Sequence, residues 1–151
     1  SLFRELLTYM MEDPRNITQC THLLFCTKSL ERIGDHACNI VYLSEMMIED
    51  KLPVTPKAKE EIFSFFVEVD SMLGEAIIAL MGESNRVAQA VIKRDSIVDE
   101  RERVLRKNHI DRVNRRECLP QAGVVYLDIL SNLERVGDHA VNLAQMITGE
   151  F

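Results

Sequence analysis

One ten-residue motif occurs twice in this chain, and this repetition constrains the fold more than any other feature. The two copies span residues 30–39 and 133–142 and read LERIGDHACN and LERVGDHAVN. Between residues 30 and 40, eight of eleven positions are identical to the positions 103 residues later. A repeat of this size indicates duplication of a supersecondary unit. The chain is therefore expected to contain two related units, each with its own copy of the motif.

The acidic residues of each copy share one face of the helix that the motif is expected to form. They stand at i and i+4, with asparagine at i+8, whereas aliphatic residues such as Leu30 and Ile33 fall on nearly the opposite side. Carboxylates one turn apart repel each other, and a cation between them removes that repulsion. Oxygen ligands suit magnesium, manganese, calcium or iron better than zinc. The motif therefore predicts metal ligands at Glu31 and Asp35 and at Glu134 and Asp138, with Asn39 and Asn142 as further candidates.

A second acidic stripe precedes the second motif. Asp95, Asp99 and Glu102 recur at i, i+4 and i+7, and in an antiparallel helix pair they could face Glu134 and Asp138. A solvated helix face is the competing interpretation of this stripe. The first motif has no equivalent stripe before it, so its site is expected to lack half of its ligands.

The histidines and arginines of the motif lie beside the acidic stripe. His36 and His139 sit about 100° round the helix from it, which favours packing against a neighbouring helix, or pairing with an aspartate, over metal ligation. Arg32 and Arg135 are candidates for holding a carboxylate in place.

Helix breakers are few and divide the chain into long segments. The pattern predicts helices at about 2–11, 16–50, 56–81, 85–115 and 121–148, with stops at Gly82 and Gly149. No alternating strand pattern occurs, so the fold class is all-α. Residues 53–151 form a complete three-helix unit, whereas residues 1–52 supply the end of one helix and one full helix. This first unit is therefore expected to be incomplete at its N-terminus.

Composition narrows the function classes. The formal net charge is −6, which does not favour a nucleic-acid partner, and the arginines of residues 101–116 alternate with acidic residues as on a solvated helix face. No apolar run reaches the length of a membrane span, and no secretory signal is visible. The four cysteines lack zinc-site spacing and are expected to be buried, reduced thiols.

The motif resembles the signature of the PhoU family, the cytoplasmic regulators of phosphate uptake. Residues 6–13, LLTYMMED, are also similar to the end of a helix in that family. The resemblance implies tandem antiparallel three-helix bundles and a multinuclear metal site, with iron first and magnesium, manganese, zinc or calcium as alternatives. It further implies negative control of the phosphate regulon through a phosphate ABC transporter subunit and a sensor histidine kinase. A homodimer that meets the membrane only through its partner is expected.

Two other functions stay open from the sequence. Residues 123–128, GVVYLD, are similar to the PhoU-like cytosolic tails of sodium/phosphate cotransporters, and membrane spans encoded upstream would favour that alternative. A carboxylate-bridged di-metal oxidase is the remote alternative. Such enzymes use Glu-xx-His pairs, and neither motif contains one, so no catalysis is expected.

Overall fold

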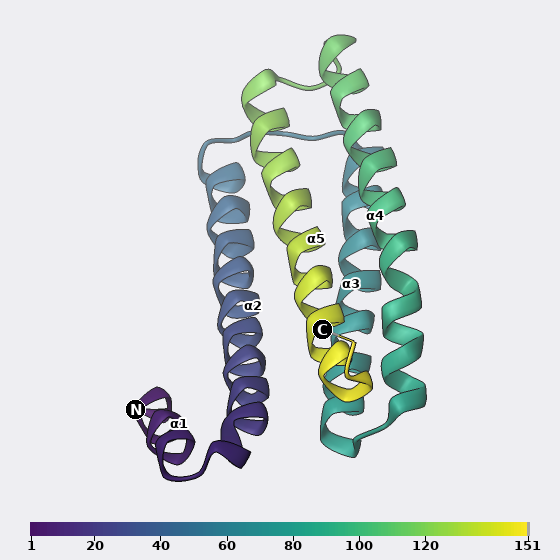
Figure 1. The fold of residues 1–151 in the computed structure, drawn as a ribbon. Helices are drawn as coiled ribbons and strands as arrows, with labels where there is room; N and C mark the ends of the chain where they lie inside the picture. Colours follow the sequence, from purple (N-terminus) through teal and green to yellow (C-terminus); the bar gives the residue numbers. More distant parts are fainter. Residues whose placement is uncertain (151) are drawn as a thin grey trace.

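The computed structural model describes residues 1–150 and is built from helices joined by short connections (Figure 1). Within that range there is no strand, which confirms the all-α fold class. Phe151, the last residue of the predicted second unit, lies outside the described residues. The elements are α1 (Leu2–Glu12), a 3-10 turn (Pro14–Asn16), α2 (Ile17–Glu49), α3 (Pro56–Gly82), α4 (Asn85–Asn114) and α5 (Pro120–Thr148).

The helix ends follow local chemistry that the sequence largely predicts. The side chain of Thr55 accepts a hydrogen bond from the backbone N–H of Ala58, and Pro56 is the first residue of α3. Ser84 caps α4 in the same way. Gly149 ends α5 with a φ of 75°, as predicted. The stop after α3 differs slightly, because the left-handed residue is Glu83, with a φ of 49°, rather than Gly82.

The helices α3, α4 and α5 pack against one another as an up-and-down bundle, and α2 lies along α5 (Figure 1). Among the described residues, α5 is the helix that contacts α2, α3 and α4 alike. It accordingly has fourteen buried residues, whereas α2, packed on one side, has four. The bundle α3–α5 corresponds to the predicted complete unit, and the division into two repeats stays a prediction.

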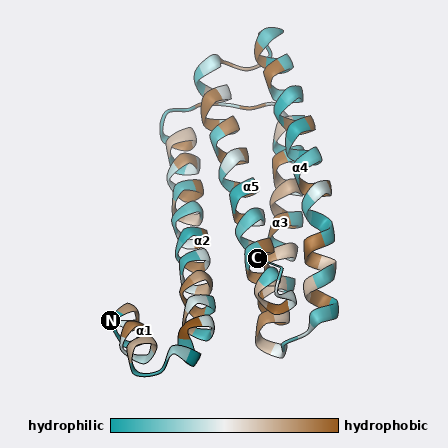
Figure 2. Ribbon diagram, in the orientation of Figure 1, coloured by the Kyte–Doolittle hydropathy of each residue, from teal (hydrophilic) through white to brown (hydrophobic). Residues whose placement is uncertain are grey.

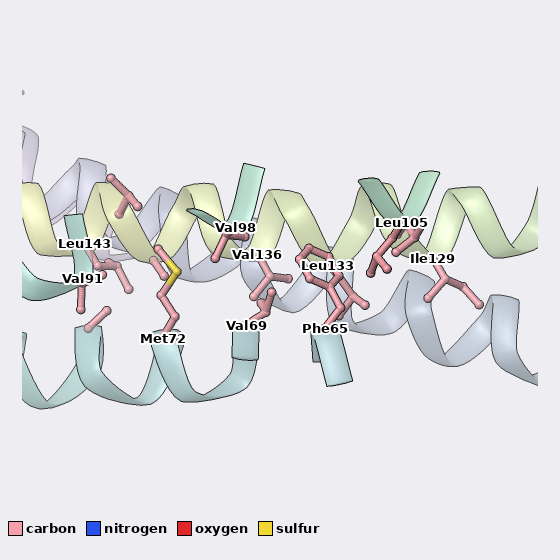
Figure 3. Packing of buried hydrophobic residues seen from close by; sticks show 14 of the residues in the cluster. Phe65, Val69, Met72, Val91, Val98, Leu105, Ile129, Leu133, Val136 and Leu143 are labelled. Atoms are coloured by element: carbon pink, nitrogen blue, oxygen red, sulfur yellow. The ribbon is translucent and has the colours of Figure 1, made fainter. Parts of the chain in front are cut away.

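The core of the bundle is a column of aliphatic and aromatic side chains between these helices. Figure 3 shows Phe65, Val69 and Met72 of α3 pointing toward Leu133 and Val136 of α5. Each fully buried side chain of this kind stabilises the fold by about 1.5–3 kcal/mol. This column fixes the register of α3 and α5 along their middle turns, where the second motif lies.

The buried face of α2 coincides only in part with the side that its aliphatic residues predict. Leu30 is 46% exposed and Val41 58% exposed, whereas Ser29, His36 and Leu43 are buried. The reason is that α2 has a long helical neighbour on one side, α5, and turns its 29–36–43 edge toward it. Ile33 and Ile40 of the predicted side are half-buried and pack against the core, so only the part around Leu30 and Val41 is left uncovered by the described residues.

The four cysteines differ in how far they are buried. Cys20 and Cys118 are buried, as predicted, and Cys26 is half-buried. The prediction was wrong for Cys38, which is exposed on α2. Within residues 1–150, no helix combines the length and the apolar character that crossing a membrane requires.

Candidate metal centre

Three of the predicted acidic ligands meet between α4 and α5. Asp95 and Asp99 project from α4, and Asp138 projects from the facing turn of α5. One carboxylate oxygen from each lies within 4.8 Å of the others. Oxygens that share a cation at 2.0–2.6 Å have separations of this size, roughly 3 to 5 Å. The antiparallel packing of the two helices therefore produces the arrangement that the two acidic stripes predict.

Glu134 belongs to the same group through Asp138. Burial, the charge of Asp138 and a hydrogen bond donated to Asp138 raise the pKa of Glu134 to about 7, and the charges of Asp99 and Glu102 add to this effect. Burial and the charge of Asp99 also raise the pKa of Asp138, although the hydrogen bond from Glu134 acts in the opposite direction. Asp95, Asp99, Glu134 and Asp138 are called the acidic cluster below.

The acidic cluster carries more negative charge than its surroundings compensate. The pKa of Asp95 is raised by burial and by the charges of Asp99 and Asp138. Burial is the largest cause of these raised pKa values, and the remainder reflects repulsion between the ionised carboxyls. A divalent cation relieves such repulsion, because it gives every carboxylate an opposite charge nearby.

An unpaired oxygen marks the centre of the acidic cluster. Oδ1 of Asp99 is buried and has no hydrogen-bond partner among the described residues. A buried carboxylate oxygen without a partner costs free energy, and native proteins rarely leave one. A bound cation satisfies it. The residues therefore fit a hard divalent ion with oxygen ligands.

Two further candidates are placed less directly. Glu102 accepts a hydrogen bond from Nε of Arg106 at 2.7 Å, and Nη2 of the same arginine reaches Oγ of Ser131, also at 2.7 Å. Asn142 is exposed, with its amide 3.5 Å from Nδ1 of His139. Glu102 lies near enough for its charge to raise the pKa of Glu134, but it is outside the group of the three closest oxygens.

The first motif is not assembled into a comparable group. Asp35 is paired with Arg32 at 3.5 Å, and both side chains are about half exposed. Among residues 1–150, no third acidic, histidine or cysteine side chain forms a cluster with Glu31 and Asp35. That this site lacks half of its ligands stays a prediction.

The motif histidines connect α2 to α5 rather than to the carboxylates. Nδ1 of the buried His36 lies 2.9 Å from Oδ1 of Asn132, and the His36 ring stacks on His139 with centroids 5.7 Å apart. Asn39 donates to the same Asn132 oxygen at 3.3 Å, so it faces α5 rather than a metal. Burial and the neighbouring charges of His36 and Arg32 lower the pKa of His139.

Asn132 is a contact residue that the sequence did not single out. It stands one position before the second motif, and its counterpart 103 residues earlier is Ser29, which is also buried. Their equivalence becomes visible only once the structure shows that both are buried, so the sequence alone could not identify them. Beside this contact lies a cavity of about 520 Å³ between α2 and α5, whose lining includes Arg32 and Arg135.

Comparisons with known proteins identify a family of similar sequences. The family model of the PhoU domain matches residues 1–43 and 64–147. A phosphate-specific transport system accessory protein PhoU homolog from Rhizobium meliloti is 61% identical over 64 residues, which cover 42% of this chain and 27% of the relative. The PhoU homolog 1 from Thermotoga maritima is 30% identical over 125 residues, covering 83% of this chain and 53% of the relative. A homolog from Caulobacter vibrioides is 50% identical over 64 residues, covering 42% and 28%.

The chain thus spans between about a quarter and about half of the length of these relatives. No solved structure matches it.

Proposed function

The chain belongs to the PhoU family, and we propose that it is a metal-binding regulator of inorganic phosphate uptake. In this proposal it acts in the cytoplasm by contact with a phosphate transporter and its sensor kinase. The relatives from Rhizobium meliloti and Thermotoga maritima carry names of phosphate-specific transport accessory proteins, which supports the phosphate context. The single observation that carries the metal is the unpaired, buried oxygen of Asp99 within the acidic cluster.

The donor set favours a hard cation. Asp95, Asp99, Glu134 and Asp138 offer carboxylate oxygens alone, which suits magnesium, manganese, calcium or iron. The family resemblance adds iron as the first candidate. A bound cation would supply positive charge at the α4–α5 contact, so that the carboxylates of the two helices attract a common centre rather than repel one another.

The chain's own residues would position these ligands. Val98 and Gly137 form the α4–α5 contact beside the acidic cluster, where a Cβ built on the glycine would lie at an ordinary 3.6 Å from Cγ1 of Val98. Arg106 donates a hydrogen bond to Glu102, and its positive charge offsets that of this carboxylate. The ligands therefore sit on two rigid helices whose register the core fixes, and a regulatory surface carried by these helices would sense the ion.

Elemental analysis of the purified protein tests the metal. We expect bound metal in the wild type and its loss in Asp138→Asn and in Asp95→Asn, because each removes one of the three closest ligands. Asp111→Asn is the matched control, since this residue lies on α4 three turns beyond Asp99 and should leave the metal content unchanged. Equal metal content in the wild type and in both ligand variants contradicts the proposal.

Phosphate uptake tests the regulatory role. Deletion of the encoding gene is expected to raise the uptake of radiolabelled phosphate by phosphate-replete cells, and the intact gene supplied in trans should restore the low rate. The Asp138→Asn gene should restore it less well if metal is needed for regulation. Uptake that is indifferent to the deletion contradicts the regulatory role without bearing on the metal.

A further inference from the structure

The cavity between α2 and α5 is lined by polar side chains. Its volume is about 520 Å³, within the roughly 300–1,000 Å³ that sites for small molecules enclose. Nine of the ten residues that line it carry a polar side chain, and Leu43 is the exception. Two of these polar residues are themselves buried, His36 with 5% exposed and Asn132 with 7%. The cavity therefore suits a small molecule that forms hydrogen bonds rather than a hydrocarbon.

The two arginines of the cavity have unused hydrogen-bond donors. Arg135 forms no hydrogen bond or ion pair with another residue of the range 1–150, although its charge opposes the rise in the pKa of Asp138. Arg32 is paired with Asp35 at 3.5 Å, which is longer than the roughly 2.7–2.9 Å of a charge-assisted hydrogen bond. Guanidinium groups bind phosphate groups through parallel N–H donors, so both arginines are suited to a phosphate group.

His36 presents an unused acceptor to the same cavity. Oδ1 of Asn132 can only accept, so Nδ1 of His36 carries the hydrogen of their 2.9 Å contact. In the neutral ring, Nε2 is then an acceptor, and it has no hydrogen-bond partner among residues 1–150. Buried polar atoms are normally satisfied, so this nitrogen indicates a ligand that donates a hydrogen bond.

Two residues of α5 add one donor and one acceptor. Oγ of Ser131 accepts from Arg106 at 2.7 Å, which leaves the hydroxyl hydrogen of Ser131 to donate into the cavity. Asp128 has one carboxylate oxygen 3.4 Å from Nδ2 of Asn132, and its other oxygen has no partner within the described range. A carboxylate in a ligand site accepts hydrogen bonds from sugar hydroxyls.

The cavity thus combines donors for an anion with acceptors for hydroxyl groups. We propose that it binds a phosphate monoester of a polyhydroxylated molecule, the chemistry shared by sugar phosphates and nucleotides. Arg32 and Arg135 hold the phosphate group, while Asp128 and His36 accept hydrogen bonds from the hydroxyls. This site goes beyond the proposed metal-dependent function and needs no ion in the acidic cluster.

The same residues make simpler ligands poorer occupants. Inorganic phosphate would leave most of the 520 Å³ unfilled and the acceptors of Asp128 and His36 without enough donors. A metal ion is disfavoured by the positive charges of Arg32 and Arg135. A sugar without a phosphate would leave the donors of these arginines unused.

Isothermal titration calorimetry of the purified chain tests the ligand. The titrations contain a chelator, so that no ion in the acidic cluster can hold the phosphate group. We expect saturable binding of ribose 5-phosphate or of adenosine monophosphate, at least tenfold tighter than that of inorganic phosphate or ribose, because each of these offers only half of the contacts.

Substitutions on α5 test the position of the site. Arg135→Gln should raise the dissociation constant of the ester about tenfold, because it removes a charged donor to the phosphate group. Asp128→Asn should lower the preference for the ester over inorganic phosphate about threefold, since the amide accepts more weakly from hydroxyls and no longer repels a bare phosphate. Arg86→Gln and Asp70→Asn, which change exposed residues of α4 and α3, are the matched controls and should bind as the wild type does.

The results separate the two sources of the ester. Tighter binding of adenosine monophosphate supports a nucleotide, whose base can stack on the exposed Tyr42, and tighter binding of ribose 5-phosphate supports a sugar phosphate. No saturable binding of either ester overturns the proposal, as does inorganic phosphate bound equally well. Ester binding that is unchanged in both Arg135→Gln and Asp128→Asn overturns it too, because the ligand then lies outside this cavity.

Discussion

At the level of single residues, the acidic cluster places its carboxyls where ionisation is unfavourable until a cation arrives. Glu134 has its pKa raised to about 7, against an ordinary value of 4.5, and Asp99 keeps an oxygen buried without a partner. Both properties reduce the stability of the metal-free protein. Residues retained at a cost to stability are typical of functional sites.

The Glu134→Gln substitution should therefore stabilise the metal-free protein at pH 8. Because the folded-state pKa of Glu134 is raised, the folded state binds a proton more tightly than the unfolded state between about pH 4.5 and 7. The destabilisation is thus complete above pH 7 and disappears as the pH falls toward 4.5. Glutamine removes it, with a gain of roughly 1–2 kcal/mol once solvent screening is allowed for.

Urea unfolding in the presence of a chelator measures this gain at pH 8 and at pH 5. The difference between Glu134→Gln and the wild type should shrink at the lower pH. A variant less stable than the wild type at pH 8 would show that Glu134 is a structural partner of Asp138 rather than a strained ligand.

The helices are joined in their upper half by a polar group centred on His109. Its ring is fully buried, stacks on Tyr126 of α5 at 3.8 Å and lies 3.2 Å from Nε of Arg112. Arg112 in turn bonds Glu61 of α3 at 2.8 Å, so that one group ties α3, α4 and α5 together. Figure 2 shows α4 mainly teal along this upper half, where its charged residues alternate with the few that enter the core. Burial and the charge of Arg112 lower the pKa of His109 to about 4.

His109 should make the bundle lose stability in mild acid. Its folded-state pKa is about 4 against an ordinary 6.5, so the unfolded state takes up a proton first as the pH falls. Above pH 6.5 the ring is neutral in both states and costs the fold no stability. The loss grows between pH 6.5 and about 4 and reaches roughly 3 kcal/mol at most.

The pH dependence of unfolding, compared between the wild type and His109→Phe, isolates this effect because the other titrating groups cancel. The wild type should lose more stability than the variant between pH 7 and pH 4.5. Parallel curves would mean that the fold does not lower the pKa of His109.

Removing the hydroxyl oxygen of Tyr126 tests the contact between α3 and α5. Its hydroxyl donates a hydrogen bond to the carbonyl of Ala58, at 2.8 Å, in the buried junction between α3 and α5. Tyr126→Phe leaves that carbonyl without this partner and should cost about 1–2 kcal/mol in free energy of unfolding, with no change in bound metal. Denaturant unfolding and elemental analysis of one preparation check both statements, and a change in metal content would contradict the separation of the two sites.

The sequence predicts helices better than it predicts their faces. Helix ends follow from Thr55, Pro56 and Gly149, because capping depends on neighbours within one turn. The proximity of the acidic residues of α4 and α5 could be predicted, because consecutive antiparallel helices joined by a short loop pack side by side. The buried edge of α2 could not be predicted in the same way. It depends on contacts with α5 such as that of His36 with Asn132, which are 96 residues apart in the sequence.

For the whole molecule, metal binding should appear as thermal stability. A ligand present at a hundred times its dissociation constant adds about 2.7 kcal/mol, and in a chain of this size 1 kcal/mol corresponds to roughly 2–4 °C. The midpoint of thermal unfolding should therefore rise by about 5–10 °C when the metal-free protein is loaded.

Differential scanning fluorimetry with a series of divalent ions measures this rise and ranks the ions. Asp138→Asn should abolish it, whereas Asp111→Asn should keep it. A rise of equal size in the two variants would place the ion elsewhere in the chain.

The position of α5 between α2 and α4 has a consequence for the proposed regulatory role. Asp138 belongs to the acidic cluster beside α4, and the next residue, His139, stacks on His36 of α2. The residue proposed as a ligand of the ion is therefore directly followed in the chain by the residue whose ring contacts α2. Any coupling between the two contacts is reciprocal. A partner that binds α2 would change the affinity for the proposed ion by the same factor by which the ion changes the affinity for the partner.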